Sequence, residues 1–343
     1  MTVLYRKYRP QDFKEVLGQE EVIAALTGAL SLDRVAHAYL FAGSRGTGKT
    51  SVARILARAL HTSDADLYEI DAASHRQIDD IRALREAVVA PPFSSRYKVY
   101  ILDEVHMLTR DAWNALLKTL EEPPPHALFI LATTEYEKVP ETVLSRCQIF
   151  RFKKPSQKVL KETVEQIAEK EGFAIETPAA ELIALLAEGS YRDAQGVLEK
   201  AVSVASHKKV TLAAVESVTG APKAELVLRF IGALERQDRE EALATIGEVT
   251  KGNHDVALFA RLLLMRLRFI LLLRNAPKMA DEIREETTPE EFTFLEQCAT
   301  NKESRINSAL LLEFLAAFDL MRTALMPELP LELAAIRLTG QVR

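Results

Sequence analysis

The chain has 343 residues, with 44 lysines and arginines against 49 aspartates and glutamates, so its formal net charge is −5. This length is sufficient for two or three domains, each with a hydrophobic core of its own. The negative net charge excludes a protein that coats nucleic acid by bulk electrostatic attraction, so any DNA contact must come from a local basic patch.

The chain begins with a basic, aromatic segment and not with an export signal. Residues 1–10, MTVLYRKYRP, contain no apolar core of the kind that directs secretion. The two cysteines, Cys147 and Cys298, fit a reducing compartment and cannot form a zinc site by themselves. We therefore expect a cytoplasmic protein, whose first long helix is predicted over residues 20–30.

A phosphate-binding motif lies between a predicted strand at residues 36–42 and a predicted helix at residues 52–60. The segment GSRGTGKTS fits the pattern G-x-x-x-x-G-K-[ST], whose backbone N–H groups and helix N-terminus suit phosphate oxygens. Lys49 can reach the β- and γ-phosphates, and the Thr50 hydroxyl can bind Mg²⁺. The pattern predicts a nucleotide-binding loop made of Gly43, Ser44, Arg45, Gly46, Thr47, Gly48, Lys49, Thr50 and Ser51.

Further strands alternate with helices along the first half of the chain. Because strands that alternate with helices form a parallel sheet, functional side chains should gather at the carboxyl ends of the strands. Ser74 is the predicted N-cap of the helix that follows the second strand. The predicted strands are residues 67–73, 98–105, 127–134 and 148–152, and the predicted helices between them are residues 74–90 and 110–122.

Three polar residues lie at the ends of two of these strands. Asp103 ends an apolar run and can hold Mg²⁺ through its water shell, and Glu104 can polarise a water for attack on the γ-phosphate. Two acidic residues at a strand end are more often solvated, but after a phosphate loop they predict Mg²⁺-dependent ATP hydrolysis. Thr134 is a candidate γ-phosphate sensor, although threonine is also common in strands for structural reasons.

The second half of the chain shows only helical patterns. One stretch, residues 256–273, is apolar enough to suggest a membrane span, but Arg261, Arg266 and Arg268 would be costly in lipid. A buried helix is the better interpretation. Composition changes near residues 153 and 220, so we predict an α/β core over residues 1–152, a small helical lid over 153–220 and a helical collar over 221–343.

Taken together, these motifs resemble the AAA+ P-loop ATPases, and more closely the γ/τ subunit family of the bacterial DNA polymerase III clamp loader. This resemblance implies an ATPase that uses ATP binding and hydrolysis to open a sliding clamp and load it on primer–template DNA during replication. The residues that carry it are YRKYRPQDFKEVLGQE (5–20), HAYLFAGSRGTGKTSVAR (37–54), EIDAAS (69–74), YILDEVHMLTRDAWNALLKTLEEPP (100–124), LATT (131–134), LSRC (144–147) and GSYRDA (189–194).

The resemblance implies roles for matching residues of the ATP site. Thr134 would be the first sensor, and Arg192 a second sensor that moves onto the phosphates when the lid closes. Arg146 would be a finger that reaches a neighbouring subunit's nucleotide, although a lone arginine is usually a solvated surface residue. The implied catalytic set is Lys49, Asp103, Glu104, Thr134, Arg146 and Arg192, with Thr50 and Asp103 on Mg²⁺. The implied adenine pocket is Tyr8, Arg9, Pro10 and Val16, with Leu4, Tyr191 and Arg192 beside it.

The resemblance carries over less completely to DNA and to zinc. The helix after EIDAAS presents basic residues to the template backbone in the family, but of His75, Gln77 and Arg82 only Arg82 keeps a fixed charge. A solvated helix face is an equal alternative for the other two, and Thr142 is a further DNA candidate. The family's four-cysteine zinc module would fall at residues 60–66, where this chain has no cysteine, so we expect no structural zinc.

The implied partners are a sliding clamp, δ and δ′ clamp-loader subunits, further γ/τ copies and primer–template DNA, with no membrane. Polymerase core and replicative helicase would join them if a C-terminal extension exists.

One alternative is another AAA+ motor, a branch-migration helicase or an unfoldase, but neither an inserted β-hairpin nor an aromatic pore loop is evident. A non-hydrolysing stator is the other alternative, and the intact Lys49, Asp103 and Glu104 argue against it.

Overall fold

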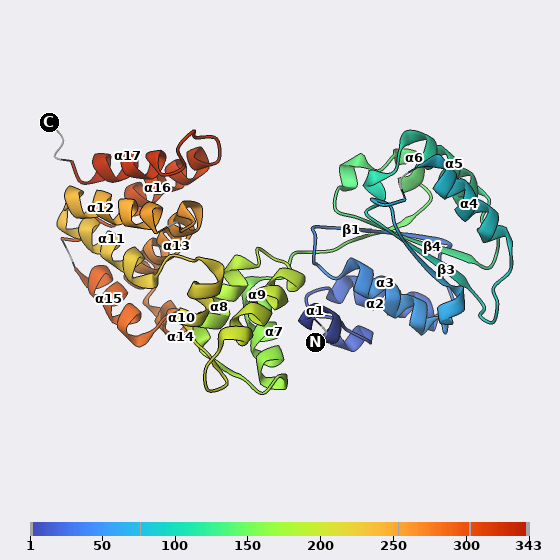
Figure 1. The fold of residues 1–343 in the computed structure, drawn as a ribbon, viewed down its shortest axis with the longest axis horizontal. Helices are drawn as coiled ribbons and strands as arrows, with labels where there is room; N and C mark the ends of the chain where they lie inside the picture. The colour runs from blue at the N-terminus through green and yellow to red at the C-terminus, as the bar shows by residue number, and fades with distance from the viewer. Residues whose placement is uncertain (1–2, 76, 253, 302, 341–343) are drawn as a thin grey trace. The chain divides into compact units, whose positions relative to one another are not determined.

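The chain forms two compact units in the computed structural model (Figure 1). The first unit comprises residues 1–167 and 184–196, and the second comprises residues 168–183 and 197–343. The division into core, lid and collar at residues 152 and 220 remains a prediction. The structure describes residues 3–75, 77–252, 254–301 and 303–340.

A five-stranded parallel sheet with the order β2-β3-β4-β1-β5 lies within the first unit. Parallel neighbours need crossover connections, and helices supply them here. The strands β1, β3 and β4 are buried along almost their whole length, as expected for central strands covered on both faces. The predicted parallel α/β core is thereby confirmed. The strands are β1 (Ala38–Ala42), β2 (Leu67–Asp71), β3 (Lys98–Asp103), β4 (Ala127–Thr133) and β5 (Gln148–Arg151).

The two faces of the sheet carry two separate hydrophobic clusters because successive side chains of a strand point to opposite faces. Leu40 and Tyr100 belong to the cluster beneath α4 and α5, whereas Phe41 and Ile101 belong to the cluster beneath α2 and α3. Figure 1 shows these helix pairs on opposite sides of the strands. The helices are α1 (Leu4–Lys7), α2 (Glu20–Ser31), α3 (Lys49–Ala59), α4 (Ile78–Val89), α5 (Arg110–Glu121) and α6 (Glu141–Leu144).

The helix predicted to start at Ser74 starts instead at Ile78, so that boundary was wrong by four residues. The Ser74 hydroxyl donates to Asp71 Oδ2 at 3.0 Å, which holds a turn after β2 in place of a helix cap. Gln77 is the N-cap, and the Asp80 carboxylate accepts from the Gln77 N–H at 3.2 Å in a reciprocal capping box.

The remainder of the chain is almost entirely helical, as predicted. The exception is a two-stranded parallel sheet in the second unit, β6 (Ala174–Ile175) with β7 (Lys209–Val210), which is too short to produce a visible alternation. The helices are α7 (Gln157–Lys170), α8 (Thr177–Leu186), α9 (Tyr191–Val204), α10 (Leu212–Thr219), α11 (Ala224–Arg236), α12 (Arg239–Lys251), α13 (Val256–Asn275), α14 (Ala280–Glu285), α15 (Pro289–Thr300), α16 (Ser308–Met321) and α17 (Leu329–Leu338).

Two arginines of the apolar helix α13, Arg266 and Arg274, have polar partners within the second unit. Arg266 forms an ion pair with Glu291 of α15, and both side chains are nearly inaccessible to solvent. Because its partners satisfy the guanidinium, a charged group is tolerated in an apolar environment. Arg274 similarly donates to three backbone carbonyls, those of Cys298, Ala299 and Ile306. Among the described residues, every helix is too short or too polar to cross a membrane.

The segment at the position of the family's zinc module is held by a buried carboxylate. Asp66, only 1% exposed, accepts from the N–H groups of Phe93 at 2.5 Å, Ser94 at 3.0 Å and Ser95 at 2.9 Å. The Ser63 hydroxyl donates to it at 2.9 Å. Burial raises the pKa of Asp66, but these donors together hold that pKa well below its usual value. No cluster of three or more His, Cys, Asp and Glu side chains among the described residues is arranged to hold a metal ion.

We predict that Asp66→Asn lowers the free energy of unfolding at pH 7 by about 2 kcal/mol, because amide oxygen accepts these hydrogen bonds more weakly than carboxylate. Since the folded-state pKa is depressed, the stabilisation is complete above the unfolded pKa of about 4 and is lost as the pH falls further. Urea unfolding at pH 7 and at pH 3 measures both effects. Asp64→Asn, at an exposed aspartate, is the matched control, and equal loss from both variants would contradict the prediction.

Candidate functional site

The predicted nucleotide loop connects β1 to α3 and is built around left-handed glycines. Gly48 has a φ of 100° and is the N-cap of α3, and the Gly43 N–H donates to the Thr133 carbonyl at 3.1 Å. Gly46 has a φ of 72°, and a Cβ there would lie 1.9 Å from Ser190 Oγ. The loop therefore presents the N-terminus of an eleven-residue helix to any anion bound within it.

Lys49 is the most deeply buried cation of this loop, with 5% of the residue exposed. Its Nζ donates to the carbonyls of Gly43 at 2.7 Å and Ser44 at 2.9 Å. Burial lowers the pKa of Lys49, and the carboxylates of Glu104 and Asp103 oppose that shift. A lysine held by two carbonyls inside the loop is placed to exchange them for phosphate oxygens.

The two predicted Mg²⁺ ligands contact each other. The Thr50 hydroxyl donates to Asp103 Oδ2 at 2.7 Å, which joins the first turn of α3 to the end of β3. Both are oxygen ligands, the class that Mg²⁺ prefers when it also keeps waters and binds phosphate. Ser44 Oγ is buried without a hydrogen-bond partner among the described residues. An orphaned hydroxyl in the loop and a hydroxyl–carboxylate pair beside it fit a nucleotide with Mg²⁺.

Glu104 and Thr134, which follow adjacent strands, also come together. Glu104 Oε2 accepts from Thr134 Oγ1 at 2.9 Å and from the Thr134 N–H at 3.3 Å. Glu104 has a φ of 50°, so the chain makes a left-handed turn immediately after β3. The structure therefore places the candidate water-activating carboxylate against the candidate γ-phosphate sensor.

The interpretation of the sequence missed His106, whose ring lies in the same cluster. Its side chain is 7% exposed and contacts Glu104, Thr133 and Glu135. No periodicity or motif spacing marks this histidine, because its partners come from two different strand ends. Gln19 was missed because its partner is distant in the chain: its buried amide exchanges hydrogen bonds with the backbone of Lys153.

Residues at the start of α9 contact the N-terminal segment and the loop. The Tyr191 N–H donates to the Gly46 carbonyl at 3.0 Å, and its hydroxyl donates to the Leu17 carbonyl at 2.8 Å. Burial raises the pKa of Tyr191 to about 12. The Arg192 guanidinium lies 4.7 Å from the centre of the Tyr5 ring, a cation–π distance. The predicted second sensor therefore lies against the N-terminal segment in this structure.

The other implied adenine-pocket residues lie along that segment. Leu4 is buried in α1, and Tyr8 is the C-cap of the same helix. Burial, followed by repulsion from Arg54, lowers the pKa of Arg9. Pro10 is half-buried, and Val16 packs against the cluster beneath α2 and α3. These positions are compatible with a pocket wall, and the adenine contacts themselves remain a prediction.

Arg146 is bound elsewhere in its own subunit. Its guanidinium pairs with Glu121 at the end of α5 at 2.7 Å and donates to the Thr142 carbonyl at 2.7 Å. About one third of its side chain is exposed. In the described part of the chain, no contact joins Arg146 to the phosphate loop. A finger that serves a neighbouring site would have to leave Glu121.

The implied DNA residues lie in or beside α4 and α6, and the side chains of three of them have partners within the chain. Gln77 caps α4, and His75 lies 3.5 Å from a carboxylate oxygen of the same cap. Arg82 is exposed and pairs with Asp79 on its own helix at 3.2 Å, an interaction that contributes little and is easily exchanged for phosphate. Thr142 lies in α6. Arg76 lies outside the described residues.

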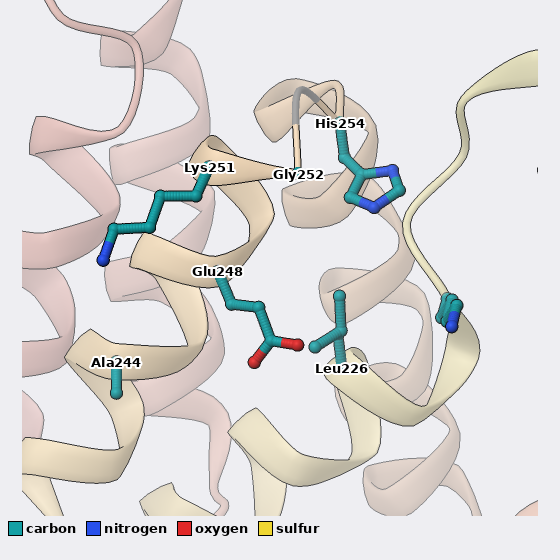
Figure 2. Close-up of a pocket in the computed structure, with 7 residues that line it drawn as sticks. Leu226, Ala244, Glu248, Lys251, Gly252 and His254 are labelled. Atoms are coloured by element: carbon teal, nitrogen blue, oxygen red, sulfur yellow. The ribbon is translucent and has the colours of Figure 1, made fainter.

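A separate hollow of about 550 Å³ lies in the second unit, between α11 and α12 (Figure 2). None of the predicted site residues lines it. Glu248, on its wall, is paired with Arg229, and His254 Nδ1 lies 3.1 Å from the Gly220 carbonyl. The lining residues are Lys223, Leu226, Ala244, Glu248, Lys251, Gly252 and His254.

Comparison with known proteins gives three kinds of match: a family profile, a solved structure and curated relatives. The profile of a family described as "DNA polymerase III, delta subunit" matches residues 18–69 and 61–156. The Thermotoga maritima RuvB Holliday junction branch migration motor has the same fold, with a TM-score of 0.53 at 21% identity over 84% of this chain and 91% of that one. At this identity the likeness shows the fold alone, and that fold agrees with the predicted parallel α/β core followed by helices.

Curated relatives are more similar in sequence. DNA polymerase III subunit tau of Bacillus subtilis is 38% identical over 316 residues, 86% of this chain and 56% of the relative. DNA polymerase III subunit gamma/tau of Mycobacterium tuberculosis is 36% identical over 362 aligned positions, 98% of this chain and 62% of the relative. The tau subunit of Escherichia coli is 42% identical over 267 residues, covering 72% and 41%. The chain thus spans about half the length of these relatives.

We predict that Gly46→Ala lowers the free energy of unfolding by about 2 kcal/mol and weakens nucleotide binding about tenfold. The left-handed backbone disfavours alanine, and the new methyl group must displace Ser190. Thermal unfolding and titration with a fluorescent ATP analogue measure the two effects. Gly196→Ala is the control, because this glycine lies inside α9 with open space around it and should stabilise the helix. Unchanged nucleotide affinity in Gly46→Ala would contradict the prediction.

Proposed function

The chain belongs to the family of bacterial DNA polymerase III gamma/tau subunits over the region that it shares with them, and from this we propose that it is the ATP-hydrolysing motor subunit of a clamp loader. ATP binding would open a sliding clamp and hold primer–template DNA, and hydrolysis would release the clamp on the DNA. The observation that carries the proposal is the meeting of Thr50 with Asp103 and of Glu104 with Thr134 beside the buried Lys49.

Each residue of this cluster has a role in hydrolysis. Lys49 would leave its two carbonyl acceptors for the β- and γ-phosphates, and the orphaned Ser44 hydroxyl would donate to a phosphate oxygen. Mg²⁺, when bound through Thr50 and Asp103, supplies charge neutralisation between the phosphates. Glu104 accepts the proton of the attacking water as that water attacks the γ-phosphorus and ADP leaves.

The lid would contain a second group that responds to bound ATP. We place Arg192 as the group that would exchange the Tyr5 ring for the γ-phosphate when ATP binds. The base would be held by the pocket wall described above, with Tyr191 joining the lid to the loop through the Gly46 carbonyl. These separate roles are compatible with the predicted domains, which are a core over residues 1–152, a lid over 153–220 and a collar over 221–343.

The proposed site is completed by partners. Arg146 would reach a neighbouring subunit's γ-phosphate, which requires an assembly of further copies with δ and δ′ subunits. Arg82 is the first candidate for the template backbone, because its exposed ion pair with Asp79 exchanges readily for phosphate. The free thiols of Cys147 and Cys298 are compatible with a reducing cytoplasm.

We predict that the chain, assembled with its partner subunits, hydrolyses ATP faster when sliding clamp and primed DNA are both present. Lys49→Ala should lower that rate at least about 100-fold, because it removes the charge that binds the phosphates. A coupled phosphate-release assay measures the rate, with Lys158→Ala, at an exposed lysine, as the control. The proposal fails if clamp and primed DNA do not stimulate the wild-type assembly.

Arg146→Ala should separate binding from hydrolysis. ATP affinity should stay within about twofold of wild type, and the stimulated rate should fall about 10³-fold, the contribution of an arginine finger. Equilibrium binding of a fluorescent ATP analogue and single-turnover hydrolysis measure the two quantities in the assembly. Arg110→Ala, at an exposed arginine at the start of α5, should leave both unchanged. Full hydrolysis by the Arg146→Ala assembly would remove the finger from the mechanism.

A further inference from the structure

The roles proposed above leave the imidazole of His106 unused. This histidine lies in the single-turn helix Val105–Met107 that follows β3, and 7% of its side chain is exposed. Nδ1 lies 3.4 Å from Glu104 Oε2 and 3.1 Å from Thr133 Oγ1, while Nε2 lies 3.3 Å from Glu135 Oε1. A buried ring is therefore held between two carboxylates, one of which is the proposed proton acceptor.

The contacts of the Glu104 carboxylate fall on one of its two oxygens. Oε2 accepts twice from Thr134 and faces His106 Nδ1, and no hydrogen bond of the described residues reaches Oε1. Because one oxygen is fixed, the other is left to accept a proton from water in a defined direction. Glu104 has a left-handed backbone, which is unfavourable for a residue other than glycine, so the surrounding contacts impose its position.

The opposite side of the imidazole is joined to the segment that carries Arg146. Glu135 is held twice, because its carboxylate faces Nε2 and its N–H donates to Thr133 Oγ1 at 3.0 Å. The chain then passes through the single-turn helix Tyr136–Lys138 and α6 before it reaches Arg146. Segment 135–146 therefore begins at the His106 cluster and ends at the proposed finger.

We propose that His106 is a positioning residue that fixes Glu104 for water activation and couples it to segment 135–146. This inference rests on the proposed ATP hydrolysis. When a neighbouring subunit draws Arg146 away from Glu121, the movement of the segment reaches Glu104 through Glu135 and the imidazole. A subunit would then hydrolyse its own ATP at a rate that depends on whether its finger is engaged.

A purely structural role for His106 makes a different prediction. A packing histidine would affect the free energy of unfolding, but it would leave kcat unchanged in molecules that remain folded. His126 offers the comparison, because among the described residues the ring of this partly buried histidine makes one hydrogen bond, which Nε2 donates to the Val88 carbonyl at 3.0 Å. His126→Asn is therefore the matched control for a lost histidine hydrogen bond.

The test measures ATP hydrolysis in the assembly with partner subunits, sliding clamp and primed DNA. His106→Ala should lower kcat about 10- to 100-fold and leave the KM for ATP within about twofold. His106→Asn, whose amide nitrogen can take the place of Nδ1 beside Glu104, should recover most of the lost rate. Glu135→Gln should lower kcat about 3- to 10-fold, and it should have no further effect in the His106→Ala background, because the connection is already cut.

Histidine side-chain ¹⁵N NMR supplies a readout independent of turnover. The chain has seven histidines, and His106→Asn identifies the resonances of His106. Those resonances should move in both Glu104→Gln and Glu135→Gln, and His126→Asn should leave them in place. If the His106 resonances move in neither variant, the coupling is overturned. This readout does not require turnover, so it applies even if the wild-type assembly hydrolyses no ATP. That absence of hydrolysis would contradict only the proposed function. An unchanged kcat in His106→Ala, with an active wild-type assembly, overturns the positioning role and leaves the proposed function standing.

Discussion

The parallel register of three central strands is the constraint on which the candidate site depends. Ala42 of β1 pairs with Thr133 of β4, and Leu102 of β3 pairs with Leu131 of the same strand. The chain therefore leaves all three strands at one edge of the sheet, where a phosphate loop, two carboxylates and two threonines meet. Because both faces of these strands are buried, a slip by one residue would move each row of core side chains into the hydrophobic cluster on the opposite face, which is packed for a different set of side chains.

Short sequence motifs predicted those parts of the candidate site that depend on residues close together in the chain. The phosphate loop has fixed spacing, and an apolar run followed by Asp103-Glu104 marks a strand that ends at a functional edge. From these signals the sequence predicted the sheet, the order of its motifs and the candidate ligands. The contact between the Thr50 hydroxyl and Asp103 follows from the fold, since the first turn of α3 and the end of β3 lie at the same edge of the sheet.

Features that depend on the meeting of distant side chains could not be predicted. His106 and Gln19 acquire their partners only when separate loops come together, and neither lies in a pattern that sets it apart. Asp71 captures the Ser74 hydroxyl, so a residue suited to capping a helix closes a turn instead. The pair β6–β7 is two residues long, below the length at which alternation carries information.

The Asp66 carboxylate has a consequence for how this part of the molecule opens. By accepting from the amides of Phe93, Ser94 and Ser95, it closes a ring of chain that contains β2, the following turn and all of α4. The ends of that ring cannot separate without releasing a buried charge, so the ring should exchange its amide hydrogens as one cooperative unit. The helix that presents Arg82 is therefore held at both ends, through the turn after β2 and through the Asp66 hydrogen bonds, and because β2 pairs with β3, a force applied to this helix reaches β3 and the edge of the sheet where the candidate site lies.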